Sequence, residues 1–232
     1  MNKNNKFQIL TTKSTEIEKI QFSKLYKTGT EITKSLVKYN GKEFLIKTPP
    51  LVLGSDIIKC GDEYYIDLII GENKMCNQTK KSKRSNDFLE LIKNIDYLVI
   101  SEIYENGQSW YQQNTDPSLI QIERDFIPTI KLSTINDSLQ SMKFKVNANN
   151  VEFFDYDNES VSYQLLKKGY RSNALLKLSQ IYKQGDHLWI DWQILQLKTE
   201  IPQQMLNGCH LTDVNLSIDE DEETVCDDES DY

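Results

Sequence analysis

Apolar and polar residues alternate in short runs along most of the chain, and a period of two is typical of half-buried β-strands. The Asn-Gly pair at Asn40 and Gly41 separates two such runs and predicts a tight hairpin between them. The predicted strands cover residues 33–39, 42–47, 64–70, 118–123, 129–132, 142–146, 151–156, 175–182 and 187–197.

One segment instead repeats apolar residues at steps of three and four, which predicts a helix over residues 86–104 with Ser85 as its cap. The residues that make this pattern are Phe88, Leu91, Ile92, Ile95, Leu98, Val99 and Ile103. Many strands with one inserted helix favour a mostly β fold, an OB-fold-like five-stranded barrel with additional strands. A β-sandwich and a jelly roll are the alternatives.

Charge is distributed unevenly along the 232 residues, whose formal net charge is -8. From Thr199 to Tyr232 there is no Lys or Arg, and this segment holds 11 of the 35 acidic residues. The remaining residues, 1–198, contain 24 acidic and 27 basic residues, a formal charge of +3. We therefore expect a basic folded domain over residues 1–200 and a disordered acidic tail over residues 201–232.

Basic residues gather in clusters that suit a phosphate backbone. The first 47 residues hold 10 Lys against 4 Glu, and a denser cluster falls in a predicted loop before the helix. In the run MKFKV, alternation places two lysines on the face opposite Met142, Phe144 and Val146. The alternative is that each cluster is only a solvated surface or a targeting peptide. The predicted phosphate contacts are Lys42, Lys47, Lys80, Lys81, Lys83, Arg84, Lys143, Lys145, Lys167, Lys168 and Arg171.

Aromatic residues on polar strand faces are candidates for base stacking. In the run GDHLWIDWQILQLK, Leu188, Ile190, Trp192 and Ile194 alternate toward one side, which leaves Trp189 on the other with His187, Asp191 and Gln193. In VEFFDY the two phenylalanines face opposite ways, so one ring lies outside the core. The alternative for a single Trp is packing under a loop. The predicted stacking residues are Trp110, Phe153 and Trp189.

Catalytic and metal-binding motifs are absent from the sequence, which contains no P-loop, dinucleotide fingerprint, zinc-protease motif or nucleophile elbow. Asp155 and Asp157 suit a turn better than a magnesium site. The four widely spaced cysteines, Cys60, Cys76, Cys209 and Cys226, predict free thiols. We expect no enzyme, cofactor or metal, and neither a membrane span nor a secretory signal.

Three segments carry a resemblance to known proteins: GDHLWIDWQILQLK, the run PTIKL at 128–132, and the terminal DDESDY. With the basic β body and inserted helix, they resemble the single-stranded DNA-binding proteins of podophages and, more closely, their relatives in nucleo-cytoplasmic large DNA viruses. The podophage proteins end in Phe where this chain has Tyr232. The abundant Lys, Asn and Ile also suit an A+T-rich genome.

The resemblance implies an OB-fold protein that binds single-stranded DNA without sequence preference in viral replication and recombination, in the host cytoplasm or the virion. It also implies that the tail contacts replicative DNA polymerase and other replication proteins. Because an acidic tail with a terminal aromatic residue can imitate single-stranded nucleic acid, we further expect the tail to cover the DNA groove in the free protein. The tail residues concerned are Asp227, Asp228, Glu229, Asp231 and Tyr232. Edge-strand pairing and tail exchange are two routes to a homodimer.

Two other classes of function remain open at this point. A virion core or packaging protein would use the acidic tail for solubility and show no preference for single strands. A late transcription or processivity accessory would bind protein through the helix face.

Overall fold

A computed structural model describes residues 8–29, 32–71, 80–132 and 139–202, without the side chains of residues 80–82. These residues lie almost entirely in the first of two units, Met1–Ile201. The predicted division between residues 200 and 201, and the disorder of the tail, stay predictions because residues 203–232 lie outside the described part. The predicted tail contacts Asp227, Asp228, Glu229, Asp231 and Tyr232 lie outside it as well.

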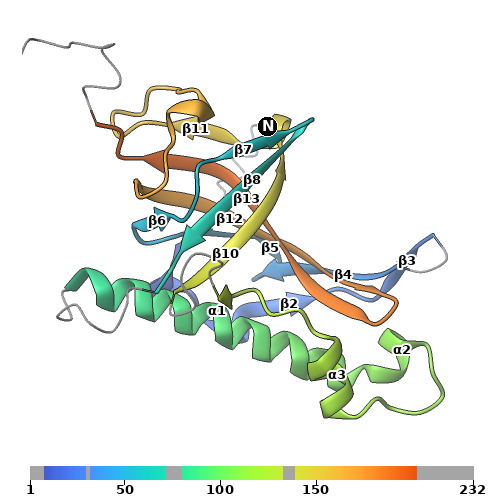
Figure 1. Cartoon of the computed structure of the whole chain (residues 1–232). Helices are drawn as coiled ribbons and strands as arrows, with labels where there is room; N and C mark the ends of the chain where they lie inside the picture. The colour runs from blue at the N-terminus through green and yellow to red at the C-terminus, as the bar shows by residue number, and fades with distance from the viewer. Residues whose placement is uncertain (1–7, 30–31, 72–79, 133–138, 203–232) are drawn as a thin grey trace, which may run out of the picture. The chain divides into compact units, whose positions relative to one another are not determined.

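The mostly β class and the single long helix are confirmed, as Figure 1 shows. The short strands are β1 (Ile9–Thr11), β2 (Ile20–Phe22), β3 (Tyr26–Thr28), β6 (Leu51–Leu53), β7 (Ile58–Cys60), β9 (Lys131–Leu132) and β11 (Glu152–Phe154). The longer strands are β4 (Ile32–Tyr39), β5 (Lys42–Lys47), β8 (Glu63–Ile69), β10 (Gln140–Asn147), β12 (Arg171–Gln184) and β13 (His187–Thr199). The helices are α1 (Lys80–Glu105), α2 (Gly107–Tyr111) and α3 (Leu119–Asp125), with 3-10 turns η1 (Thr12–Ser14), η2 (Ile17–Lys19), η3 (Ala148–Asn150) and η4 (Tyr163–Leu165).

The long strand β12 organises the sheet because it pairs antiparallel with β4, β5, β6 and β13. Two irregularities in its register with β13, at Leu175/Leu176 and between Leu178 and Gln180, are the kind of bulge that bends a strand. The main path runs β1-β5-β4-β12-β6-β8-β10-β9. Within the described residues no ladder joins β10 to β13, so the OB-like sheet stays open along that line.

Two tight turns fix the register of the long hairpins. Asn40 and Gly41 have φ of 49° and 75°, as a two-residue turn with both central residues left-handed requires. Gly185 has φ of 55° and begins the turn between β12 and β13, so Gln184 pairs with His187. The pairs from Gln184–His187 to Gln180–Asp191 follow from this turn, up to the first of the two irregularities.

Helix α1 buries its apolar stripe in the same core as the strands, with Phe88, Ile92, Ile95, Val99 and Ile103 fully buried. Figure 1 shows α1 lying across one side of the sheet with α2 and α3 near its C-terminal end. A helix at this place was predicted, and its stripe is confirmed.

Two details of the helical region were predicted wrongly. The helix begins at Lys80 rather than residue 86, so Ser85 is a buried residue one turn before Leu89 and not a cap. The predicted strand 118–123 is helix α3, because the Ser118 hydroxyl accepts a hydrogen bond from the Gln121 N–H and caps a helix that buries Ile122.

Candidate nucleic-acid interface

Trp189 and Tyr182 form a flat aromatic pair on the outer face of the β12–β13 hairpin. The register places them directly opposite each other, their ring centroids are 5.2 Å apart, and their planes differ by 9°. Both rings are half-buried. On the other side of Tyr182, the register with β4 places Lys34, whose Nζ lies 4.8 Å from the Tyr182 ring centroid. Burial raises the pKa of Tyr182, so its hydroxyl stays neutral.

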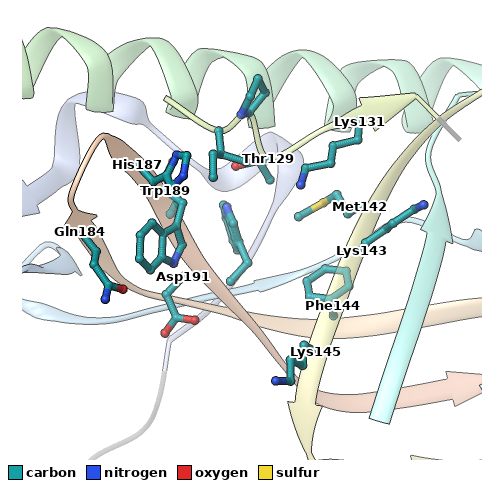
Figure 2. Close-up of a pocket in the computed structure, with 14 residues that line it drawn as sticks. Thr129, Lys131, Met142, Lys143, Phe144, Lys145, Gln184, His187, Trp189 and Asp191 are labelled. Carbon is teal, nitrogen blue, oxygen red and sulfur yellow. The ribbon is translucent and has the colours of Figure 1, made fainter. Parts of the chain in front are cut away.

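A cleft of about 500 Å³ opens beside this pair, along the line where β10 and β13 are not joined. Figure 2 shows Trp189, His187 and Asp191 on one side of the cleft and Lys143 and Lys145 on the other. The segment before and within β9 closes one end of the cleft through Thr129 and Lys131. An aromatic surface therefore faces a wall that carries two ammonium groups, and Lys131 adds a third at the closed end.

The lysine wall is positioned by strand alternation in β10. Met142, Phe144 and Val146 are buried, while Lys143 and Lys145 are exposed, as predicted. Lys145 forms an ion pair of 2.9 Å with Glu63, and this hydrogen bond raises the pKa of the lysine. Both side chains stay partly exposed, so an incoming phosphate can compete with Glu63 for this lysine.

The end wall is fastened to helix α1 by a buried carboxylate. Asp96 accepts hydrogen bonds from the Thr129 hydroxyl at 2.6 Å and from the Thr129 N–H at 2.9 Å. Burial raises the pKa of Asp96 to about 6, although the two hydrogen bonds act in the opposite direction. The position of Thr129 in the cleft is thus set from the core and not from the surface.

The cleft floor contains one donor without a partner. Trp192 is buried and lines the cleft, and its Nε1 has no hydrogen-bond acceptor among the described residues. A buried donor left in this state costs about 1–3 kcal/mol.

A second concave surface of about 520 Å³ lies at the far end of the same hairpin. Tyr156 is 64% exposed there, and the Nζ of Lys198 lies 5.1 Å from its ring centroid and donates a hydrogen bond to Asn158. Phe154 and Lys47 also line this surface. Lys198 is nine residue steps beyond Trp189 along β13, which corresponds to about 30 Å at the rise of a strand.

The third concave surface, of about 460 Å³, adjoins the second through Lys47 and Asn173. It adds Lys13 and Arg84 from the amino-terminal turn and from α1. Within the described residues no ion pair neutralises Lys13, Lys47 or Arg84, so this surface is basic. The basic side chains of this surface continue those of the second surface, which includes Lys198.

Two of the three predicted stacking residues lie in the core. Trp110 is 1% exposed, and Phe153 is 8% exposed with its ring edge-on to Tyr64 at 5.3 Å. We withdraw both, since a base cannot reach either ring. In VEFFDY the half-buried ring is Phe154, so the expectation of one outward phenylalanine was right and the choice between the two was wrong.

The predicted lysines and arginines are not on one surface. Lys143, Lys145 and Trp189 share the first cleft, and Lys47 and Arg84 share the third. Lys42 lies at the β4–β5 turn, and Lys167 pairs with Asp56 at 3.5 Å. Lys168 is exposed, whereas Arg171 is half-buried in β12. Lys80, Lys81 and Lys83 lie in the first turns of α1 and not in the predicted loop, and the side chains of Lys80 and Lys81 are outside the described part.

Several residues of these surfaces were missed at the sequence level. They are Tyr182, Lys34, Lys131, Tyr156 and Lys198. Tyr182 carried a usable signal, because the Gly185-Asp186 turn pairs residues 182 and 189 by simple counting. The others lie on elements that only the fold brings together.

The described residues give no sign of a metal site, since no group of three or more His, Cys, Asp or Glu among them is arranged to hold an ion. Asp155 is buried, and its Oδ1 accepts the N–H groups of Asp157 and Glu159. It therefore shapes its own turn, as its sequence context favours. Cys60 is a free, exposed thiol, and the other cysteines lie outside the described part. No helix in the described part has the length and hydropathy of a membrane span.

Solved structures of known proteins include chains that are similar in structure to this one. A single-stranded DNA-binding protein from bacteriophage Enc34, in a C-terminally truncated form, aligns over 77% of this chain and 96% of its own, with a TM-score of 0.41 and 10% identity. No protein-family model matches the chain. No curated protein matches it in sequence. The function therefore has to be argued from the chain's own residues.

Proposed function

We propose that this chain binds single-stranded DNA and acts without catalysis. The observation that carries the proposal is the parallel Trp189–Tyr182 pair beside a cleft whose opposite wall is basic. Aromatic surfaces flanked by lysines are the usual means of holding a single strand, because every base has a face that can stack and every nucleotide has a phosphate. In a duplex the base faces are stacked inside the helix, so a duplex would gain only the electrostatic attraction between its phosphates and the lysines.

The proposed path places the bases on β13 and the phosphates along β10. Bases stack on Trp189, and phosphates contact Lys131, Lys143 and Lys145. The strand then follows the hairpin toward Tyr156 and Lys198. A length of about 30 Å is compatible with the roughly 4–16 nucleotides that one OB-fold covers.

The acidic segment after Thr199 gives the proposal its regulatory part, which rests on sequence alone. A polyanion that ends in Tyr232 offers charges to the same lysines and a ring to the same stacking surface. We propose that it competes with DNA for the cleft and, once displaced, recruits replicative DNA polymerase and other replication proteins. A role in replication and recombination of a large DNA virus, in the host cytoplasm or the virion, belongs to the same proposal.

The test is fluorescence anisotropy of labelled oligo(dT) and of a matched duplex, titrated with full-length protein and with a version ending at Ile218. Preferential binding to oligo(dT) that weakens steeply with salt supports the cleft. Tighter binding after truncation supports the competing tail. Equal binding to duplex and single strand would contradict the proposal.

One surface favours a second candidate, a protein-binding accessory or structural role. Ile120 is 79% exposed on α3, and Tyr97 and Tyr104 are exposed on α1. Apolar side chains on a helical face are typical of protein contacts. This candidate predicts that substitutions at Ile120 and Tyr97 impair partner binding and leave DNA binding intact.

A further inference from the structure

A carboxylate lies in the middle of the proposed base-binding surface. Asp191 follows Trp189 on the same face of β13, and the register places it opposite Gln180, the neighbour of Tyr182 on that face. Figure 2 shows Asp191 beside Trp189, on the side of the cleft opposite Lys145. A negative charge repels phosphate, so only the base side of a nucleotide suits this position.

The Asp191 carboxylate already accepts a hydrogen bond but retains acceptor positions for further donors. Gln193 Nε2 donates a hydrogen bond of 2.8 Å to its Oδ2, and Gln180 provides a second polar neighbour. An ionised carboxylate has roughly four acceptor positions, so further donors can be accommodated. Burial raises the pKa of Asp191, while Gln193, Gln180, Lys177 and Lys34 act to lower it. In its ionised form the carboxylate accepts hydrogen bonds and has no proton to donate.

A base beside this acceptor is favoured when its edge carries an amino group. Cytosine offers its 4-amino group, and carboxylates are the usual acceptors for it. Thymine presents a carbonyl oxygen at the same position, and two acceptors facing each other repel. Cytosine and thymine present similar faces for stacking, so a difference in affinity between them comes from the groups on their edges.

Resting on the proposed single-strand binding, we propose that Asp191 gives one position of the cleft a preference for bases with an exocyclic amino group, cytosine over thymine. The remaining positions stack bases without regard to their edges. The protein then binds every sequence, with one site of modest discrimination next to Trp189.

The experiment compares two oligonucleotides built only from thymine or only from 5-methylcytosine. These bases carry the same methyl group and differ at position 4 and in the proton on N3. Full-length protein is titrated near neutral pH at constant salt, and the ratio of the two Kd values is the readout. Asp191→Asn keeps the shape and adds an amide donor that suits thymine. Asp186→Asn, in the β12–β13 turn, is the matched loss of one charge.

We expect wild type to bind the 5-methylcytosine strand roughly fivefold to tenfold more tightly, as for about 1 kcal/mol of base discrimination. Asp191→Asn should bring the ratio to about one or below, and Asp186→Asn should leave it unchanged. A wild-type ratio near one, or a ratio that Asp191→Asn does not move, overturns the inference while single-strand binding stands. Absence of binding to both strands overturns the proposed function itself.

Discussion

The two ends of the β12–β13 hairpin carry similar residues that are held in different ways. Near the turn, Trp189 is fixed by parallel contact with Tyr182 and faces a wall fastened by the buried Asp96–Thr129 bonds. At the other end, Tyr156 is largely exposed, and its main neighbour is Lys198 at the surface.

This difference separates a rigid binding surface from an adjustable one. A ring already held in place loses little freedom when a base stacks on it, whereas an exposed ring has to be ordered at that moment. Lys198 also occupies one face of Tyr156, so a base must displace the cation or use the other face. We therefore expect most of the affinity to reside near Trp189.

The largest effect we predict concerns Asp96, whose hydrogen bonds attach Thr129 in the end wall of the cleft to helix α1. Because the pKa of Asp96 is raised from 3.8 to about 6 in the folded protein, the folded state binds the extra proton between these values. The contribution of Asp96 to the free energy of unfolding thus falls as pH rises through that window, by roughly 3 kcal/mol. Asp96→Asn should abolish this part of the pH dependence, measured by urea unfolding between pH about 4 and about 7.

The control is Asp87→Asn, which removes the same charge from an exposed position on the same helix. Its unfolding curve should keep the wild-type dependence on pH. If Asp96→Asn and wild type change in parallel, burial does not raise the pKa of Asp96 in the folded protein, and the rigid end loses that support.

The next effect tests the stacking surface itself. Trp189→Ala should weaken oligo(dT) binding by about 1–3 kcal/mol, the usual range for one base on an aromatic ring. Anisotropy measures the loss, and thermal melting checks that the half-buried side chain can be removed without unfolding. Tyr97→Ala removes an exposed ring from α1 and should leave Kd unchanged. Equal effects of the two substitutions would move the binding surface away from the hairpin.

A smaller effect separates charge from stacking. Lys143→Ala should lower the slope of log K against log salt by about 0.7, the contribution of one phosphate contact on a single strand. Lys93→Ala on α1, where the lysine pairs with Glu90, is the matched control and should leave the slope unchanged. A slope unaffected by Lys143→Ala would remove β10 from the phosphate path.

The sequence predicted elements well where local pattern decides them. Alternation placed β4, β5, β8, β10 and β13 within one or two residues of their observed ends, because a strand with one buried face must repeat every second residue. The segment at 118–123 failed, since its apolar residues Leu119 and Ile120 are exposed and the Ser118 cap decided the outcome. A capping residue occupies a single position, so as a signal for prediction it is weaker than a pattern that extends over six residues.

The site was predicted less well, because it depends on which strands become neighbours. Trp110 and Trp189 both have polar residues nearby in the sequence, and only tertiary packing buries Trp110. Tyr182 was recoverable from the Gly185 turn, since pairing across a two-residue hairpin is a matter of counting. Thr129 is held at the cleft by hydrogen bonds to Asp96 of α1, a contact between distant parts of the sequence that no local pattern predicts.

The smallest effect tests the adjustable end. Tyr156→Ala should weaken binding only about twofold to fivefold, because stacking there must offset a cation–π contact of roughly 0.5–1 kcal/mol with Lys198. The loss should appear with oligonucleotides long enough to span both ends and vanish with strands that cover only the Trp189 end. Trp189→Ala should weaken both lengths, and the double variant should show additive losses on the long strand, since the two rings are about 30 Å apart along β13. An equal loss on short and long strands would place Tyr156 within the first cleft's footprint and contradict a path along the hairpin.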